Sequence, residues 1–199
     1  ILQTRETVFL CQGPPGWTPS YSQCMRSNFI NVSRDGKLFT RTIEFYEADV
    51  PIGFVFFKLQ VAMRVVTAKG KTLIEALEVS NGDVFPDEEI KEVRKKPKPS
   101  SPPQAEPRSL SKAGLLYKSG VNRIPVLFAS NSCIVLGSSE VNAKFGCTLW
   151  KTESRISYPS RCCNFAILSL CSSRVYEAYY YERDVCHLLD AKEKKTKQG

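Results

Sequence analysis

Apolar residues alternate with other residues along the segment 54–66, FVFFKLQVAMRVV. Every second position from Val55 to Val65 is apolar, whereas the opposite face mixes aromatic with charged and polar residues. Because successive side chains of a strand point to opposite faces of a sheet, this period of two predicts a long strand with one face in the core. The following AKGK, 68–71, predicts a turn, since Gly70 tolerates a positive φ.

The neighbouring segments carry similar short-period patterns. KLFTRTIEFY at 37–46 alternates and predicts a strand before the long one. TLIEALEVS at 72–80 predicts a returning strand, although its apolar spacing also suits a short helix. Short apolar runs separated by Gly, Asn and Ser then predict an antiparallel meander: GLLYKSG (114–120), IPVLFA (124–129), CIVLGS (133–138) and FGCTLW (145–150).

One early segment, 19–33, has helical spacing instead. Ser20 is a candidate N-cap, and the residues expected along one face are Tyr21, Cys24, Met25, Phe29 and Ile30. The whole pattern predicts an α+β fold, a dominant antiparallel sheet with one early helix. We expect a sheet domain at 1–147, followed by a cysteine- and tyrosine-rich extension at 148–189 with a compact fold of its own.

The formal net charge of +8 is concentrated in two segments. Residues 91–112 hold seven basic and two acidic residues, and the tail 190–199 holds four Lys and two acids, so the remaining body is nearly neutral. The Pro-rich segment 87–112 predicts a disordered basic insertion, and the tail predicts a frayed basic end. Both segments serve solubility or tether the protein to phosphate groups, with candidate contacts at Lys95, Lys96 and Lys98.

The eight cysteines form no C-x-x-C pair, and His187 is the single histidine of the chain. This pattern favours disulfides over a zinc site or free thiols in an intracellular protein. Disulfides place the protein in a secretory or extracellular compartment. The cysteines expected to form them are Cys11, Cys24, Cys133, Cys147, Cys162, Cys163, Cys171 and Cys186.

No catalytic motif is present in the sequence: G-x-S-x-G, the P-loop and G-x-G-x-x-G are all missing. The carboxylates Glu44, Glu47 and Asp49 fit a solvated strand end better than a hydrolytic or metal site. A Cys–His nucleophile pair would have to use His187. We therefore assign no catalytic residue, metal or cofactor. The sequence favours a binding protein and leaves enzyme activity as an open alternative.

The most distinctive surface candidate is the segment 175–184, VYEAYYYERD. Its tyrosines cannot all face one core, and tyrosine offers a large contact area with a polar tip, which suits recognition. Nearby arginines suit stacking on bases or pairing with a partner's acids. The predicted binding residues here are Arg174, Tyr176, Tyr179, Tyr180 and Arg183.

The chain has an early Phe9-Leu10-Cys11, and later Tyr117, Gly120, Arg123 with IPVLF, CIVLG, and Phe145-Gly-Cys147. These short motifs between residues 7 and 147 resemble those of the secreted ribonuclease-like effectors of plant-pathogenic fungi. The resemblance implies a ribonuclease-like fold in which Cys11 pairs with Cys147, which leaves Cys24 and Cys133 as a second pair. It also places Arg123 where the family binds a phosphate.

That resemblance implies binding without catalysis, because no histidine occurs in 1–147 to act as general acid. The function predicted first is a secreted, non-catalytic interaction protein, a pathogen effector that acts in a host cell and binds a host protein or RNA. An intracellular nucleic-acid-binding protein that uses its basic loop and tail is the alternative, and a small secreted hydrolase is a third. No apolar run reaches the roughly 18 residues of a membrane-spanning helix.

Overall fold

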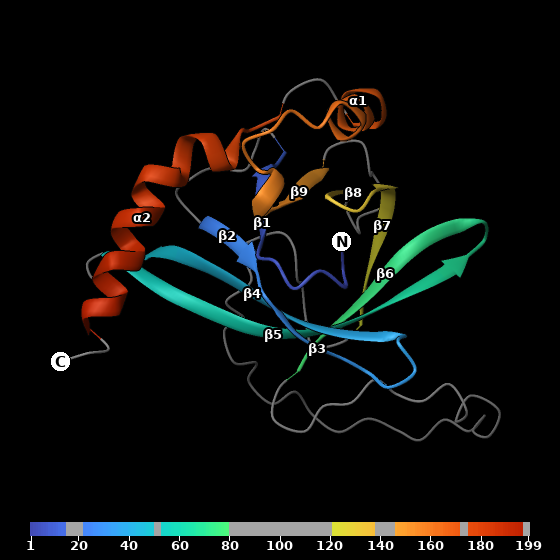
Figure 1. Cartoon of the computed structure of the whole chain (residues 1–199), viewed down its shortest axis with the longest axis horizontal. Coiled ribbons are helices and arrows are strands. Elements are labelled where there is room, and N and C mark those ends of the chain that lie inside the picture. Colours follow the sequence, from blue (N-terminus) through green and yellow to red (C-terminus); the bar gives the residue numbers. More distant parts are fainter. Residues whose placement is uncertain (15–21, 50–52, 80–120, 138–145, 172–174, 197–199) are drawn as a thin grey trace, which may run out of the picture.

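The computed structural model describes residues 1–14, 22–49, 53–79, 121–137, 146–171 and 175–196 (Figure 1). These residues form one antiparallel sheet in the order β2-β1-β9-β8-β7-β6-β5-β4-β3. The strands are β1 (Val8–Gln12), β2 (Gln23–Ser27), β3 (Phe29–Val32), β4 (Leu38–Asp49), β5 (Gly53–Ala68), β6 (Lys71–Glu78), β7 (Asn122–Ala129), β8 (Cys133–Leu136) and β9 (Thr148–Thr152).

The sheet closes on itself, because β2 at one end also pairs with β4 near the other end. β2 and β3 are separated only by Asn28, and both pair with β4, so they act as one interrupted strand. The result is an antiparallel β-barrel with eight strand positions. The predicted α+β ribonuclease-like fold is therefore wrong, although the antiparallel sheet within it was expected correctly.

The long strand and its turn confirm the prediction from alternation. β5 pairs with β4 from Leu38 opposite Arg64 to Asp49 opposite Gly53, and it turns into β6 through Lys69 and Gly70. Both turn residues have positive φ, 52° and 73°, which is the geometry that a two-residue hairpin turn needs.

Which residues of β5 are buried depends on where the neighbouring strand β4 begins and ends. Val61 and Met63 are buried in the core cluster, together with Ile74 of β6 and Trp150 of β9. Val65 continues the same alternation but is 49% exposed. It lies beyond Leu38, the first residue of β4, so no β4 side chain covers it.

The early helix predicted at 19–33 is wrong, because residues 23–27 and 29–32 are strands. Cys24 has a φ of 61°, which no right-handed helix accommodates. Cys24 and Met25 are both buried although they are consecutive, since Met25 faces the barrel core and Cys24 faces a covering helix. A strand buried on both faces loses its alternation, which is why the segment looked helical.

Two α-helices in the described residues pack on the barrel. α1 (Arg161–Leu170) lies at one end, against β7, β8 and β9, and follows a short 3-10 turn, η3 (Glu153–Arg155). α2 (Ala178–Thr196) runs down the outside along β1 and β2 (Figure 1). No helix in the described ranges has both the length and the apolar character to cross a membrane.

Three disulfides join the helices to the barrel. Cys24–Cys186 links β2 to α2, Cys133–Cys163 links β8 to α1, and Cys147–Cys171 links the start of β9 to the end of α1. Disulfide bonding is confirmed, but the pairs Cys11–Cys147 and Cys24–Cys133 implied by the resemblance are wrong. The reason is that α1 and α2 pack back on the barrel and bring their own cysteines to these partners, which leaves Cys11 buried and Cys162 exposed as free thiols.

Several predicted segments fall elsewhere than expected or outside the described residues. Residues 148–152 form β9, between β1 and β8, so the segment that follows the predicted boundary at 147 belongs to the sheet. The tail from 190 to 196 continues α2 instead of fraying. The basic insertion at 87–112, the run at 114–120 and the last residues 197–199 lie outside the described residues.

Candidate functional site

The first hollow is a cavity inside the barrel with a volume of about 90 Å³. Seven strands contribute apolar side chains to it, β2 contributes Ser27, and residues 1–2 reach into it from the start of the chain. Its lining residues are Ile1, Leu2, Val8, Ser27, Arg41, Ile43, Val61, Met63, Ile74, Ala76, Ile124, Ile134, Leu136 and Trp150.

Arg41 is the charged residue of this lining, and its side chain is 2% exposed. β4 places it inside, because it has the same phase as the buried Phe39 and Phe45. Its Nε donates to Ser27 Oγ at 2.9 Å, and its Nη2 donates to the carbonyl oxygens of Ser27 at 2.9 Å and Glu6 at 3.0 Å. These bonds fix the orientation of the guanidinium.

The remaining nitrogen of Arg41 holds the start of the chain. Nη1 donates to the carbonyl oxygens of Leu2 at 3.3 Å and Thr4 at 2.7 Å. The side chains of Ile1 and Leu2 pack against the core cluster of the barrel. Residues 1–4 therefore occupy part of the barrel interior, both by side chains and by main-chain oxygens.

The charge of Arg41 has no carboxylate partner among the ion pairs of the described residues. Neutral oxygen atoms and the face of Phe29, whose ring centroid lies 5.9 Å from Cζ, contact it. The Ile1 α-amino group is also near, since burial and then the charge of Arg41 lower its pKa. Burial lowers the pKa of Arg41 to about 10, so the side chain keeps its proton at neutral pH. The barrel therefore holds a cation whose charge no described anion balances.

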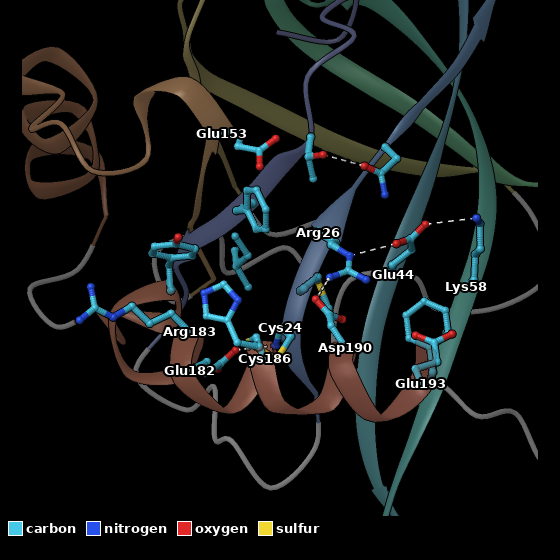
Figure 2. Close-up of a pocket in the computed structure, with 18 of the residues that line it drawn as sticks. Cys24, Arg26, Glu44, Lys58, Glu153, Glu182, Arg183, Cys186, Asp190 and Glu193 are labelled. Carbon is cyan, nitrogen blue, oxygen red and sulfur yellow. Dashed lines mark hydrogen bonds and ion pairs between the residues drawn. A yellow bond between two sulfur atoms is a disulfide. The ribbon is translucent and has the colours of Figure 1, made fainter. Parts of the chain in front are cut away.

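The second hollow is a cleft of about 550 Å³ on the outside of the barrel, between α2 and strands β1, β2, β4 and β5 (Figure 2). The Cys24–Cys186 bond joins its two walls. Its lining residues are Thr7, Phe9, Leu10, Cys24, Met25, Arg26, Asn28, Glu44, Phe56, Lys58, Glu153, Tyr179, Glu182, Arg183, Cys186, His187, Asp190, Glu193 and Lys194.

A network of ion pairs spans this outer cleft. Arg26 contacts Glu44 at 3.0 Å and Asp190 at 2.7 Å, and Lys58 contacts the other oxygen of Glu44 at 3.4 Å (Figure 2). The Tyr46 hydroxyl donates to Asp190 at 2.7 Å. Burial alone would raise the pKa of Asp190, but the hydrogen bonds from Arg26 and Tyr46 hold it below its usual value. The network thus fastens α2 to the barrel wall.

Glu182 is the least satisfied group in the outer cleft. It is 5% exposed, and its Oε2 accepts the main-chain N–H of Cys24 at 2.6 Å. Its Oε1 accepts no hydrogen bond within the described residues, although the Tyr176 hydroxyl lies near enough to favour the ionised form. Burial outweighs these contacts and raises the pKa of Glu182. The sulfurs of Cys24 and Cys186 lie beside it, but they are bonded to each other and offer no thiolate to a metal.

The predicted tyrosines separate from one another in the structure. Tyr179 lines the outer cleft and packs edge-on against Phe9, with ring centroids 5.6 Å apart. Tyr176 pairs its main chain with Gly13, while Tyr180 is 67% exposed. Arg183 lies in the lining of the cleft beside Tyr179. The structure brings these two residues together and turns Tyr180 to solvent.

The other predicted binding residues lie apart from this group. Arg123 is on β7 and pairs with Glu75 of β6 at 2.8 Å, and Glu75 also pairs with Arg64. Arg174 and the lysines Lys95, Lys96 and Lys98 lie outside the described residues. A binding role for each of them stays a prediction.

Sequence reasoning missed both Arg41 and Glu182. Arg41 had a usable signal, because it interrupts the apolar phase that Phe39, Ile43 and Phe45 share. Glu182 lies four residues before Cys186 and four after the buried Ala178, on the face of α2 that contacts the barrel. Its signal depends on recognising that helix, which the sequence analysis did not do.

Comparisons with known proteins give a likeness in structure alone. No protein-family model matches the chain, and no curated protein matches its sequence. The structure of Japanin from Rhipicephalus appendiculatus, bound to cholesterol, superposes with a TM-score of 0.56 at 11% identity, over 88% of this chain and 93% of Japanin. Lobster apocrustacyanin A1 gives a TM-score of 0.43 at 11% identity, over 87% of this chain and 76% of that one. The likeness to Japanin shows that the chain has a lipocalin-like barrel fold.

Proposed function

We propose that the protein is a secreted binding protein that holds a small, mainly apolar molecule inside its barrel. The observation that carries this proposal is the cavity itself, a hollow in the barrel lined by apolar side chains with Ser27 and Arg41 as its polar groups. Small-molecule sites in proteins are concave and mostly apolar, with a few polar groups that fix orientation. Eight-stranded barrels also have the right diameter to hold one small ligand.

The size of the cavity fits this function once the start of the chain is considered. The volume of about 90 Å³ is below the roughly 300 Å³ of common ligand sites. Ile1 and Leu2 occupy the same interior, so their movement would enlarge it. Japanin, with the same fold, is bound to cholesterol, and the three disulfides here are consistent with an extracellular compartment.

A titration with the neutral fluorophore N-phenyl-1-naphthylamine tests the proposal, because its emission rises in an apolar site. We expect saturable binding by the disulfide-bonded protein, and at least a tenfold loss in Ala76→Phe, which fills the cavity. Ala68→Phe is the matched control, since Ala68 is exposed at the end of the same hairpin. Near-UV circular dichroism checks folding, and Ile124→Trp serves as a second filling variant. Equal binding by folded filling variants would refute a site inside the barrel.

A second candidate, contact with a partner protein, is favoured by the outward face of α2. Tyr181, Val185 and Leu188 follow the helical spacing i, i+4, i+7 and are all exposed. This apolar stripe is better suited to contact a protein than RNA, because RNA would bind to the basic insertion instead. Filter binding of a 20-nucleotide single-stranded RNA at two salt concentrations separates the two partners. Salt-dependent binding that is lost when Lys95, Lys96 and Lys98 become Glu would favour RNA over a protein.

A further inference from the structure

We propose that the ligand of the barrel is an amphipathic carboxylate, an apolar chain with one anionic end, which pairs with Arg41 and displaces residues 1–4. This inference rests on the proposed function and adds the chemical class of the ligand. The feature that carries it is a buried cation in an apolar cavity, held by the carbonyl oxygens of a segment that fills the same cavity.

The charge of the residues that line the cavity determines which charge a ligand should carry. Arg41 is the charged residue among those that line the cavity, and no described carboxylate pairs with it. A buried charge is costly unless an opposite charge or strong hydrogen bonds offset the loss of water. A carboxylate would add a charge-assisted pair, whereas a neutral end adds no such pair and a cationic end is repelled.

Residues 1–4 imitate such a ligand in two respects. The side chains of Ile1 and Leu2 lie in the apolar part of the cavity, where a hydrocarbon chain would lie. The carbonyl oxygens of Leu2 and Thr4 accept from Nη1 of Arg41, where carboxylate oxygens would accept. A ligand that has both features replaces both sets of contacts at once.

The contacts that remain limit how much of the chain has to move. The Glu6 carboxylate accepts the main-chain N–H of Ser154 at 2.9 Å, and the N–H of Glu153 donates to the Thr7 carbonyl at 2.9 Å. These bonds fasten residues 6–7 to η3 while residues 1–4 leave. Nε and Nη2 of Arg41 keep their bonds to Ser27 and Glu6, so the guanidinium stays oriented toward the cavity.

Competition titrations against the bound fluorophore test the inference with three twelve-carbon ligands, dodecanoate, dodecan-1-ol and dodecylamine, at pH 8. We expect dodecanoate to bind at least tenfold more tightly than the alcohol, and the amine to bind most weakly. Arg41→Met should reduce the affinity for dodecanoate to that for the alcohol and leave the alcohol unchanged.

Leu2→Ala keeps the test informative if the Arg41 variant does not fold. Because this variant weakens the competing segment, we expect severalfold tighter binding of dodecanoate. Leu168→Ala is the control, since Leu168 is exposed on α1 and lines neither hollow. Equal affinity for the acid and the alcohol in the wild type would overturn the inference and leave the proposed function standing. Failure of all three ligands and of the neutral fluorophore to bind would overturn both.

Discussion

The bond between Cys24 and Cys186 closes the longest loop of the protein's three disulfides, with a sequence separation of 162 residues. We predict that replacing both cysteines by Ala lowers the free energy of unfolding by about 5 kcal/mol, the loop-closure entropy of a chain of that length. The bond Cys147–Cys171 closes a separation of 24 residues, for which the same relation gives about 3.5 kcal/mol. The other two bridges shorten the effective loop in the first variant only slightly, so a difference of about 1.5 kcal/mol should remain.

Urea unfolding without reductant measures both losses, with Cys162 alkylated and Cys11 replaced by Ala in every sample, because a free thiol of the unfolded chain would exchange with the disulfides. Trp150, which is buried in the barrel core, reports the transition by fluorescence. The Cys24→Ala/Cys186→Ala variant should also show a larger m-value, because its unfolded chain exposes more surface. If this variant loses no more stability than Cys147→Ala/Cys171→Ala, the loop-closure argument is wrong.

The remaining predictions concern buried carboxylates and free thiols. The folded-state pKa of Glu182 is raised, so the protein loses stability as the pH rises through that pKa. In thermal melts between pH 4 and pH 8, the melting temperature of Glu182→Gln should therefore rise relative to that of the wild type as the pH increases. The pKa of Glu75 is lowered, since hydrogen bonds, including that from Arg64, outweigh burial. Glu75→Gln should lower the free energy of unfolding by roughly 1–3 kcal/mol at neutral pH. In urea titrations this difference should shrink as the pH falls through the lowered pKa. Maleimide at pH 7 should label Cys162 alone in the native protein, because Cys11 is buried and burial raises its pKa to about 12; mass spectrometry of native and denatured samples counts the labels.

The sequence predicts the long strands because one face of each is regular. In β5 the alternation through Val61 and Met63 matches the side that packs inside the barrel, and Gly70 marks the turn to β6. β2 carries no such signal, since the core covers Met25 and α2 covers Cys24. Local patterns therefore identify a strand where one of its faces meets water and misidentify it where neither does.

Closure of the barrel depends on contacts between segments far apart in the sequence. β1 pairs with β9, and Leu10 lies opposite Trp150, a separation of 140 positions along the chain. An open sheet and a closed barrel have the same alternation within each strand, so the pattern does not distinguish them. The cysteine pairing follows the same logic, because it depends on where α1 and α2 pack and not on spacing along the chain.

Buried charges are the part of the site that the sequence does reveal when the phase of a strand is known. Arg41 takes a position where Phe39 and Phe45 indicate an apolar residue, and removing a cation from water costs several kcal/mol unless it is paired. The cost is easier to explain if the cation binds an anion at least part of the time, with the carbonyl groups of Leu2 and Thr4 as substitutes when it does not. The same reasoning gives the outer cleft less weight, because Arg26 and Lys58, two of the cations that line it, already have carboxylate partners.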